Sequence, residues 1–426
     1  MKFFFPDSQD FVDPSFDMNT EQRSPHRIRQ RDDLYAHEIF SPVPFDGVLV
    51  SMAIVLGFGS GTGKYSVAQR QRFLRQGVRD FLRIPEASGL ITFGDCGAFS
   101  YVREHEPPFS AEQVFNFYEE SGFDLGLSVD HVIPVYRPEF DETISLPGIG
   151  SEIDKWKERQ EISLALADEF MALVTARTPS FQPVGVAQGW SPASRAQAVQ
   201  KLQRMGYTRI AIGGLVPLKT DEILAILSAV DAVRTRNTRL HLLGVTRLDA
   251  ISRFKALGAT SFDSTAPLMR AFKDKNHNYF LGERTFPAIR IPQLDGNPKL
   301  KRRVLAGEVD PERARKLERQ VLDLVSEFEA DCLDTETLLT AILEYESLFD
   351  PKSDRETDYR QVLTERPWEQ CDCEICRDVG IHVVLFRGAE RNRRRGFHNI
   401  FQFRNSLTKV FDTASESLTG GLRRVR

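Results

Sequence analysis

Three cysteines and one histidine near the end of the chain have the spacing of zinc ligands. The stretch CDCEIC places Cys371, Cys373 and Cys376 in a C-x-C-x-x-C pattern. His398 follows 22 residues after the last of them. Three thiolates and one imidazole complete a closed tetrahedral site, so we expect a structural Zn²⁺ that stabilises a small subdomain. The alternatives are cysteines without a metal, or His382 as the fourth ligand, although its apolar neighbours IHVVLF favour a strand.

Polar residues and glycines follow five short apolar runs. Asp95 follows ITFG, and the other residues at such positions are Asp130, Gln188, Gly213, Gly214 and Asp263. In a (β/α)₈ barrel the C-terminal ends of the strands converge on one mouth, where the chemistry takes place. Asp and Gly also end strands as ordinary cap and turn residues, which explains any one of them alone. Five such positions together predict one pocket with paired carboxylates for acid/base or nucleophilic chemistry.

A basic stretch, RGAERNRRRGFHNIFQFRN, lies beside the cysteines. Residues 386–426 contain ten Lys/Arg and three Asp/Glu, although the whole chain is acidic. Arginine and lysine supply most protein contacts to nucleic-acid phosphates. The candidates for such contacts are Arg391, Arg393, Arg394 and Arg395. The alternative interpretation is a charged helix face in water.

The glycine-rich stretch GFGSGTGKYS, residues 57–66, resembles a phosphate-binding loop at first sight. A Walker A loop needs glycine where Phe58 stands and a small hydroxyl residue where Tyr65 stands, so the pattern fails. We expect instead a loop at the barrel mouth, with Lys64 near a nucleic-acid phosphate.

The elements that position these residues alternate from about residue 46 to 265. The apolar runs are DGVLVSMAIVLGF, LITFG, LGLSV, PVGVAQG, RIAIGGL, RLHLLGV and TSFD. Segments such as SRAQAVQKLQRMG and TDEILAILSAVDAVRT lie between them, with apolar residues at i, i+3, i+4 and i+7. This alternation predicts an α/β fold, a (β/α)₈ barrel in which seven strands are named and one is not placed.

The rest of the chain has a different composition. We expect an N-terminal extension, the barrel, a charged helical insertion and a zinc-binding basic subdomain, at residues 1–45, 46–296, 297–365 and 366–426.

The 426 residues have an ordinary globular composition, with 41% hydrophobic and 27% charged residues and a net charge of −4. Any nucleic-acid surface must therefore be local. No apolar run is long enough for a membrane span, and the start MKFFFPDSQD is unlike a signal peptide. Five cysteines, three of them crowded together, indicate metal binding in a reducing compartment. We expect a cytoplasmic protein without a membrane partner.

Several segments resemble, in the same order, motifs of the tRNA-guanine transglycosylase superfamily. They are GDCGAFS (94–100), VAQG (186–189), IGGL (212–215), LLGV (242–245) and SFDSTAP (261–267), followed by the cysteines and His398. The resemblance implies that Asp263 is the nucleophile and Asp95 the general acid/base. It also implies that Phe99 stacks on the base. The base edge would be recognised by Asp130, Gln188, Gly213, Gly214 and Leu215.

The chain departs from the tRNA enzymes in three places. The stretch LMRAFKDKNHNYF replaces their T-R-x-G-R-like element, the N-terminal residues differ, and no archaeal RNA-binding domain follows the cysteines. In these respects the chain resembles the DpdA-type branch, which places 7-deazaguanine bases in DNA.

That resemblance implies exchange of guanine in DNA for 7-cyano-7-deazaguanine (preQ0), through a covalent aspartyl-glycosyl intermediate. It also implies a helper protein, such as an ATPase that opens DNA. The alternatives are a transglycosylase that acts on tRNA and a nucleic-acid-binding barrel without catalysis.

Overall fold

The computed structural model of the chain describes residues 1–59, 63–141 and 150–421. The chain forms two compact units, the first made of Met1–Gln9, Phe45–Thr265 and Thr413–Arg426. The second is made of Asp10–Pro44 and Ala266–Asp412. In the described part of the chain, no helix is both long enough and apolar enough to cross a membrane.

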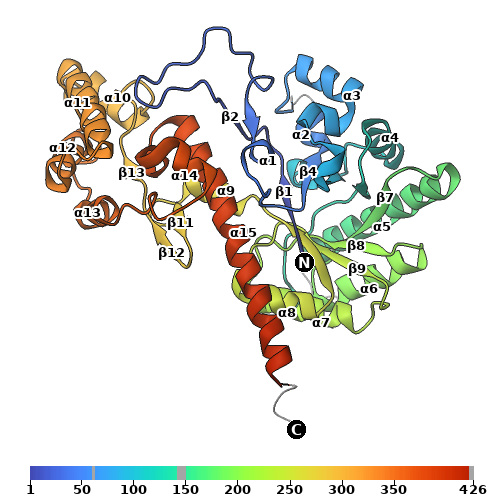
Figure 1. Ribbon diagram of the computed structural model, residues 1–426. Coiled ribbons are helices and arrows are strands. Elements are labelled where there is room, and N and C mark those ends of the chain that lie inside the picture. Colours follow the sequence, from blue (N-terminus) through green and yellow to red (C-terminus); the bar gives the residue numbers. More distant parts are fainter. Residues whose placement is uncertain (60–62, 142–149, 422–426) are drawn as a thin grey trace. The chain divides into compact units, whose positions relative to one another are not determined.

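The first unit contains a closed barrel of eight parallel strands with helices around it (Figure 1). The order around the barrel is β1-β10-β9-β8-β7-β6-β5-β4. The strands are β1 (Lys2–Pro6), β4 (Gly47–Ser51), β5 (Ile91–Asp95), β6 (Leu125–Leu127), β7 (Gln182–Ala187), β8 (Arg209–Ile212), β9 (Arg239–Leu242) and β10 (Ala259–Asp263). The predicted (β/α)₈ fold is confirmed, and its seven named strands are β4 to β10.

The strand that the sequence pattern did not place is β1. It lies at the start of the chain, within the stretch that we expected to be an N-terminal extension. Phe4 is the register partner of Gly47 on β4 and of Asp263 on β10, so β1 closes the barrel. The three phenylalanines of KFFFP are all buried, as a strand covered on both faces requires.

Helices connect successive strands and cover the outside of the barrel. They are α2 (Met52–Leu56), α3 (Val67–Leu82), α4 (Ala111–Ser121), α5 (Gly150–Arg177), α6 (Pro192–Arg204), α7 (Thr220–Asp231) and α8 (Ile251–Ala256). Short 3₁₀ turns are η1 (Glu86–Ser88), η2 (Ala98–Tyr101), η3 (Pro138–Phe140) and η4 (Leu248–Ala250). Ser66 and Ser110 begin α3 and α4 with capping boxes, which satisfy amides that the first helical turn leaves unpaired.

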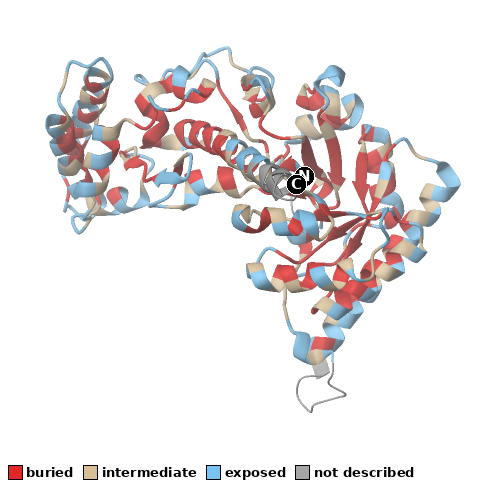
Figure 2. Cartoon of the chain, turned by 60° about the horizontal axis from the view of Figure 1, so that its bottom comes forward, coloured by how far each residue is buried: buried red, intermediate tan, exposed pale blue. Residues whose placement is uncertain are grey.

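Apolar side chains fill the barrel interior. Figure 2 shows the buried residues gathered on the strands and on the helix sides that face them. One buried cluster joins Phe4, Leu49, Phe93, Leu125, Leu127, Val184, Val186 and Ala211. The barrel is therefore a packed core, and any reaction must take place at one of its ends.

The second unit combines the segment Asp10–Pro44 with most of the chain after Ala266. Its first segment holds β2 (Phe11–Val12), β3 (Leu34–Tyr35) and α1 (Ala36–Ile39). The later elements up to the cysteines are α9 (Ala266–Lys273), β11 (Tyr279–Leu281), β12 (Arg284–Phe286), β13 (Ile289–Arg290), α10 (Pro298–Leu305), α11 (Pro311–Glu329), α12 (Thr335–Ser347) and α13 (Glu356–Glu365). The elements that follow are α14 (Glu374–Val379), η5 (Gly380–Val384), β14 (Leu385–Phe386) and α15 (Gly388–Gly421).

Candidate active site

The C-terminal ends of the barrel strands bring the predicted site residues together. Asp95 is the last residue of β5 and Asp263 the last residue of β10. Asp130 follows β6, and Gln188 follows β7 directly. These carboxylates lie close enough for the charges of Asp130 and Asp263 to act on Asp95. One end of the barrel therefore holds three aspartates, as the sequence predicted.

Asp95 is partly protonated near neutral pH. Loss of solvation, followed by the negative charges of Asp130 and Asp263, raises the pKa of Asp95 to about 7. The Gly97 amide acts in the opposite direction but does not cancel the rise. A carboxyl group with a pKa near 7 can both give and take a proton at physiological pH.

Asp130 is a buried carboxylate held in place by a glutamine. Gln188 donates from Nε2 to Asp130 Oδ2 at 2.6 Å, and its Oε1 accepts from the amide of Ile133 at 3.1 Å. A Cβ atom on Gly213 would lie 2.1 Å from that same Nε2, so only glycine leaves room for this contact. Loss of solvation raises the pKa of Asp130 to about 6, and the bond from Gln188 opposes the rise.

Cys96 and Tyr101 support Asp130 from within the protein. The Cys96 thiol donates to Asp130 Oδ1 at 3.4 Å, and the Tyr101 hydroxyl lies 3.0 Å from Cys96 Sγ. Burial raises the pKa of the Cys96 thiol, so it stays protonated and is not a nucleophile. In the same short turn, Phe99 is 52% exposed and presents its ring at the surface.

Asp263 is oriented by two donors on a single oxygen. Its Oδ1 lies 3.1 Å from His241 Nε2 and accepts from the amide of Gly244 at 3.0 Å. A carboxylate can only accept, so His241 Nε2 carries a proton, while its Nδ1 lies 2.9 Å from Ser261 Oγ. Among the described residues, none hydrogen-bonds Oδ2 of Asp263. Oδ2 is therefore available for a further contact.

The sequence did not indicate His241 or Gly244 as partners of Asp263. His241 is buried on β9, and the only sequence signal was a histidine inside the apolar run RLHLLGV. Gly244 has a φ of 72°, and a Cβ atom there would lie 2.5 Å from Val216 Cγ2. Glycine thus lets the chain turn so that its amide points at Asp263.

A buried arginine supports the Gly213-Gly214 turn, and nothing in the sequence pattern indicated it. Arg195 contacts the carbonyl oxygens of Gly213 and Ile133 at 3.4 Å each. Loss of solvation lowers the pKa of Arg195 to about 9. Gly214 has a φ of 71°, and a Cβ atom there would lie 2.3 Å from the Ile133 oxygen. Leu215, also predicted to recognise the base, is buried beside this turn.

The four predicted metal ligands form a buried cluster in the second unit. The ligand atoms of Cys371, Cys373, Cys376 and His398 all lie within 4.8 Å of one another. His398 Nδ1 lies 3.6, 3.4 and 3.3 Å from the three sulfurs in that order. Tetrahedral bonds of about 2.3 Å to sulfur and 2.0 Å to nitrogen place ligand atoms roughly 3.5 Å apart. The group has the geometry to hold a metal ion such as zinc.

Neighbouring groups fix the orientation of these ligands. His398 Nε2 lies 2.6 Å from the Phe280 carbonyl, so it carries the proton and leaves Nδ1 free for a metal. Gln402 donates to Cys371 Sγ at 3.2 Å. His382 is not the fourth ligand, because its Nε2 contacts Asn19 Oδ1 at 3.1 Å. The strand expected around His382 was also wrong, since η5 includes it and β14 begins only at Leu385.

The structure does not support phosphate contacts by three of the four predicted arginines. Arg391, Arg394 and Arg395 are at most 3% exposed. Arg391 pairs with Glu21, Arg394 with Glu390, and Arg395 donates to the Ala271 carbonyl. These guanidinium groups face inward from α15 and stabilise the second unit, so they are not available to contact DNA phosphates. Arg393, partly exposed beside the Phe11 ring, remains a candidate.

The glycine-rich stretch follows β4 and the short helix α2, and its residues 60–62 lie outside the described ones. Lys64 is exposed, and its Nζ contacts the Ser8 hydroxyl. Tyr65, by contrast, is buried and donates to Asp7 Oδ2 at 2.8 Å. The tyrosine that breaks the Walker pattern is thus a core residue.

No family model matches the chain. A DNA-guanine transglycosylase of Salmonella montevideo is 46% identical to it over 420 residues. The match covers 98% of this chain and 99% of that protein, so it includes both units. The chain therefore belongs to the DNA-guanine transglycosylase family and is a glycosyltransferase that exchanges guanine bases.

Proposed function

We propose that this enzyme replaces guanine in DNA with a 7-deazaguanine base, 7-cyano-7-deazaguanine (preQ0), through a covalent intermediate on Asp263. The observation that carries the proposal is the contrast between two carboxyl groups at one barrel end. Asp263 has one oxygen fixed by His241 and Gly244 and the other free, whereas Asp95 has a pKa of about 7. Such a pair suits a nucleophile and an acid/base catalyst.

In the first step, Oδ2 of Asp263 attacks C1′ of a deoxyguanosine. The C1′–O bond forms as the C1′–N9 bond breaks, and the electron pair of the broken bond leaves with guanine. Asp95 gives its proton to the departing base, which leaves as neutral guanine. The sugar is then held as an ester of Asp263, as in retaining glycosidases.

In the second step, the entering base reverses these events. Asp95, now ionised, takes the N9 proton of preQ0, and N9 attacks C1′ to release Asp263. Two inversions at C1′ restore the original configuration. Asp95 ends protonated and ready for another cycle.

The other strand-end residues fit recognition of a purine. A carboxylate at Asp130 can accept from both N1–H and the exocyclic amine of guanine or preQ0. Gln188 and Gly214 would contact the remaining polar edge, and the exposed ring of Phe99 would stack on the base. We propose that the target guanine flips out of the DNA to reach them, at a cost of a few kcal/mol. A helper ATPase that opens the duplex would lower that cost.

We propose that the metal ion held by the cysteines and His398 is Zn²⁺. Four protein ligands leave no position for substrate, so the ion would only stabilise the fold of the second unit.

The test is base exchange by the purified protein with labelled preQ0 and either DNA or tRNA. We expect label in DNA, and loss of at least about 10³-fold in rate for Asp263→Asn. Asp249→Asn, an exposed aspartate in η4 of the same unit, is the matched control and should keep full activity. A covalent protein–DNA adduct on a denaturing gel should form with the unmodified protein and not with Asp263→Asn.

Label in tRNA alone would overturn the DNA assignment. Normal exchange by Asp263→Asn would overturn the nucleophile. Failure of the unmodified protein on both substrates, even with cell extract as a source of helper, would favour a nucleic-acid-binding role without catalysis.

A further inference from the structure

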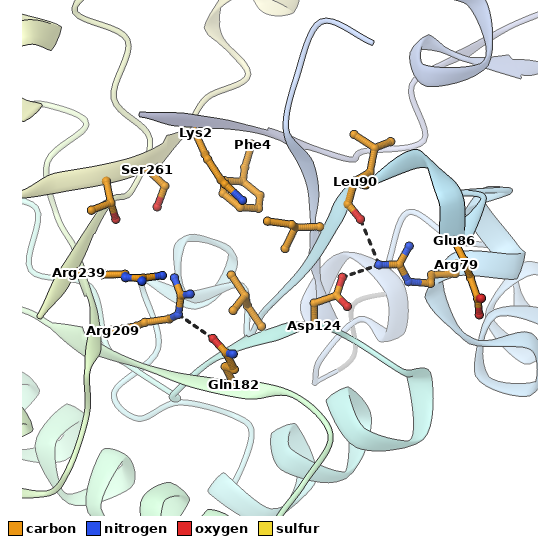
Figure 3. Close-up of a pocket in the computed structure, with 14 residues that line it drawn as sticks. Lys2, Phe4, Arg79, Glu86, Leu90, Asp124, Gln182, Arg209, Arg239 and Ser261 are labelled. Carbon is orange, nitrogen blue, oxygen red and sulfur yellow. Dashed lines mark hydrogen bonds and ion pairs between the residues drawn. The ribbon is translucent and has the colours of Figure 1, made fainter. Parts of the chain in front are cut away.

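A cavity lies at the opposite end of the barrel from the three aspartates. It has a volume of about 460 Å³, within the usual range for small-molecule sites. Lys2, Arg209 and Arg239, the first residues of β1, β8 and β9, line it together with Ser261 of β10 (Figure 3). The cavity therefore opens where the strands begin, and neither the proposed reaction nor the metal ligands involve it.

The barrel topology gathers its cations on one wall. Strands β1, β10, β9 and β8 are consecutive neighbours around the barrel. Arg209 and Arg239 are register partners, and so are Lys2 and Ser261. Neighbouring strands lie about 4.8 Å apart, so three positive side chains share a short arc. Figure 3 shows them on the same side of the cavity.

Within the described part of the chain, these cations lack acidic partners. Arg209 donates from Nε to the neutral side chain of Gln182 at 2.8 Å, and neither Lys2 nor Arg239 forms an ion pair there. Loss of solvation, followed by the charge of Arg239, lowers the pKa of Arg209. The two guanidinium groups therefore repel each other, whereas the two members of a stabilising ion pair attract each other.

The acidic residues of the cavity are placed elsewhere. Asp124 pairs with Arg79 at 2.7 Å and accepts two hydrogen bonds from Thr92. Figure 3 shows Asp124, Arg79 and Glu86 on the side away from Lys2, Arg209 and Arg239. Among the described residues, neither Asp124 nor Glu86 forms an ion pair with these three cations.

We propose that this cavity binds a small phosphate-bearing anion, such as pyrophosphate or the phosphate of a mononucleotide. Two arginines offer planar forks that match phosphate oxygens, and Lys2 adds a point charge. Three cations that are not paired with a carboxylate suit a multiply charged anion better than an anion with a single carboxylate group. Because the cavity lies at the barrel end away from the aspartates, its ligand is a free anion and not the DNA strand under modification.

The cavity wall is also connected to the proposed nucleophile. Ser261 lines the cavity, and its hydroxyl contacts His241 Nδ1 at 2.9 Å. His241 Nε2 in turn donates to Asp263 at 3.1 Å. An anion bound here would therefore lie at one end of a hydrogen-bonded chain that leads to Asp263.

The test is titration of the full-length protein with sodium pyrophosphate and with inorganic phosphate, at constant ionic strength, by calorimetry. We expect binding that weakens at least tenfold in Arg239→Gln and in Arg209→Gln. Arg236→Gln, an exposed arginine on the connection before β9 that does not line the cavity, is the matched control and should bind like the unmodified protein.

A stability measurement separates an anion site from a structural role. Without phosphate, Arg239→Gln should unfold at the same or a higher temperature than the unmodified protein, since a repulsion is removed. Equal pyrophosphate affinity in Arg239→Gln and Arg236→Gln would overturn the proposal. So would loss of affinity for single-stranded DNA in Arg239→Gln with unchanged pyrophosphate binding, which would assign the cavity to the DNA interface.

Discussion

The three aspartates at the barrel end have the same side chain but different surroundings. Asp263 receives two hydrogen bonds on one oxygen, Asp95 loses solvation beside two other carboxylates, and Asp130 is held by a glutamine and a thiol. Side-chain type alone would assign all three the same chemistry. Under the proposed function, these different surroundings would suit Asp263 as the nucleophile, Asp95 as the acid/base and Asp130 as the group that recognises the base.

His241 is expected to act as a positioning residue for Asp263. In His241→Ala, Asp263 loses one of its two donors, so we expect kcat to fall about 10²-fold with little change in the KM for preQ0. His241→Gln keeps an N–H donor and should recover part of the loss. Steady-state exchange kinetics of both variants measure this. A rise in KM with unchanged kcat would show that His241 acts on base binding instead.

Asp95 should make the stability of the protein depend on pH. Its pKa is about 7 in the folded protein and 3.8 as an isolated group, so the folded state binds the extra proton. Stability from this group is therefore complete below pH 4 and is lost as the pH rises to 7. The loss is at most about 4 kcal/mol, at roughly 1.4 kcal/mol per pKa unit.

Asp95→Asn removes that charge, and it should stabilise the protein at pH 8 but much less at pH 5. Urea unfolding at the two pH values provides the measurement. Equal effects of the substitution at both values would contradict the raised pKa.

At the scale of elements, the turns after the strands decide which polar groups meet. Gly213 leaves space for Gln188, and Gly244 turns its amide toward Asp263. Gly213 is the first residue after β8, and Gly244 is the second residue after β9. The strands bring the polar side chains to the same end of the barrel. The turns after the strands then bring these groups within hydrogen-bonding distance of one another.

Gly213→Ala should weaken base binding. Its Cβ would lie 2.1 Å from Gln188 Nε2, which would push the glutamine away from Asp130. We expect the KM for preQ0 to rise about tenfold, the cost of one lost hydrogen bond to a charged group. The double variant Gly213→Ala/Gln188→Ala should be no worse than Gln188→Ala, because the clashing partner is gone. Additive losses in this cycle would show that Gly213 acts by another route.

The metal cluster joins α14, α15 and the segment before them within the second unit. We expect one zinc per chain by elemental analysis, and its loss in Cys373→Ser. Cys332→Ser, at an exposed cysteine away from the cluster, should keep the metal. Removing the ion with a chelator should lower the unfolding temperature of the unmodified protein and leave that of Cys373→Ser unchanged. A chelator with no effect on either would argue against a bound ion.

In the whole molecule, DNA binding depends on where the positive charges lie more than on the net charge. The net charge is only −4, and three arginines of the basic stretch are buried in ion pairs or on carbonyl oxygens. Any DNA-binding surface must therefore use other cations. Lys64 is one candidate, since its ammonium group is exposed.

Lys64→Ala should weaken binding to single-stranded DNA moderately. A lysine that contacts one phosphate releases about one counterion, so the slope of log K against log salt should fall by roughly one unit. Fluorescence anisotropy over a range of salt concentrations provides the measurement. An unchanged affinity and slope would remove Lys64 from the interface.

The amino-acid sequence alone predicts seven strands of the barrel, the aspartates at their ends and the group of four candidate metal ligands. Each of these predictions follows from the local periodicity of apolar residues or from the spacing of residues along the chain. Neither property depends on where the segment lies in the folded protein. The sequence did not place β1, because KFFFP lies among Pro and Asp and its strand character depends on pairing with β4 and β10.

Which side chains contact one another depends on the three-dimensional fold. The fold brings His241 to Asp263 and places Arg195 beneath the Gly213 turn. It also buries three arginines for which the sequence pattern suggested contacts with nucleic acid. The protonation state and the solvent accessibility of a side chain depend on burial and on hydrogen bonds between segments that are distant in the sequence. The order of residues along the chain does not show these contacts. A run of arginines in the sequence can therefore form either DNA contacts or internal ion pairs. Which of the two it forms depends on how the segment packs in the folded protein.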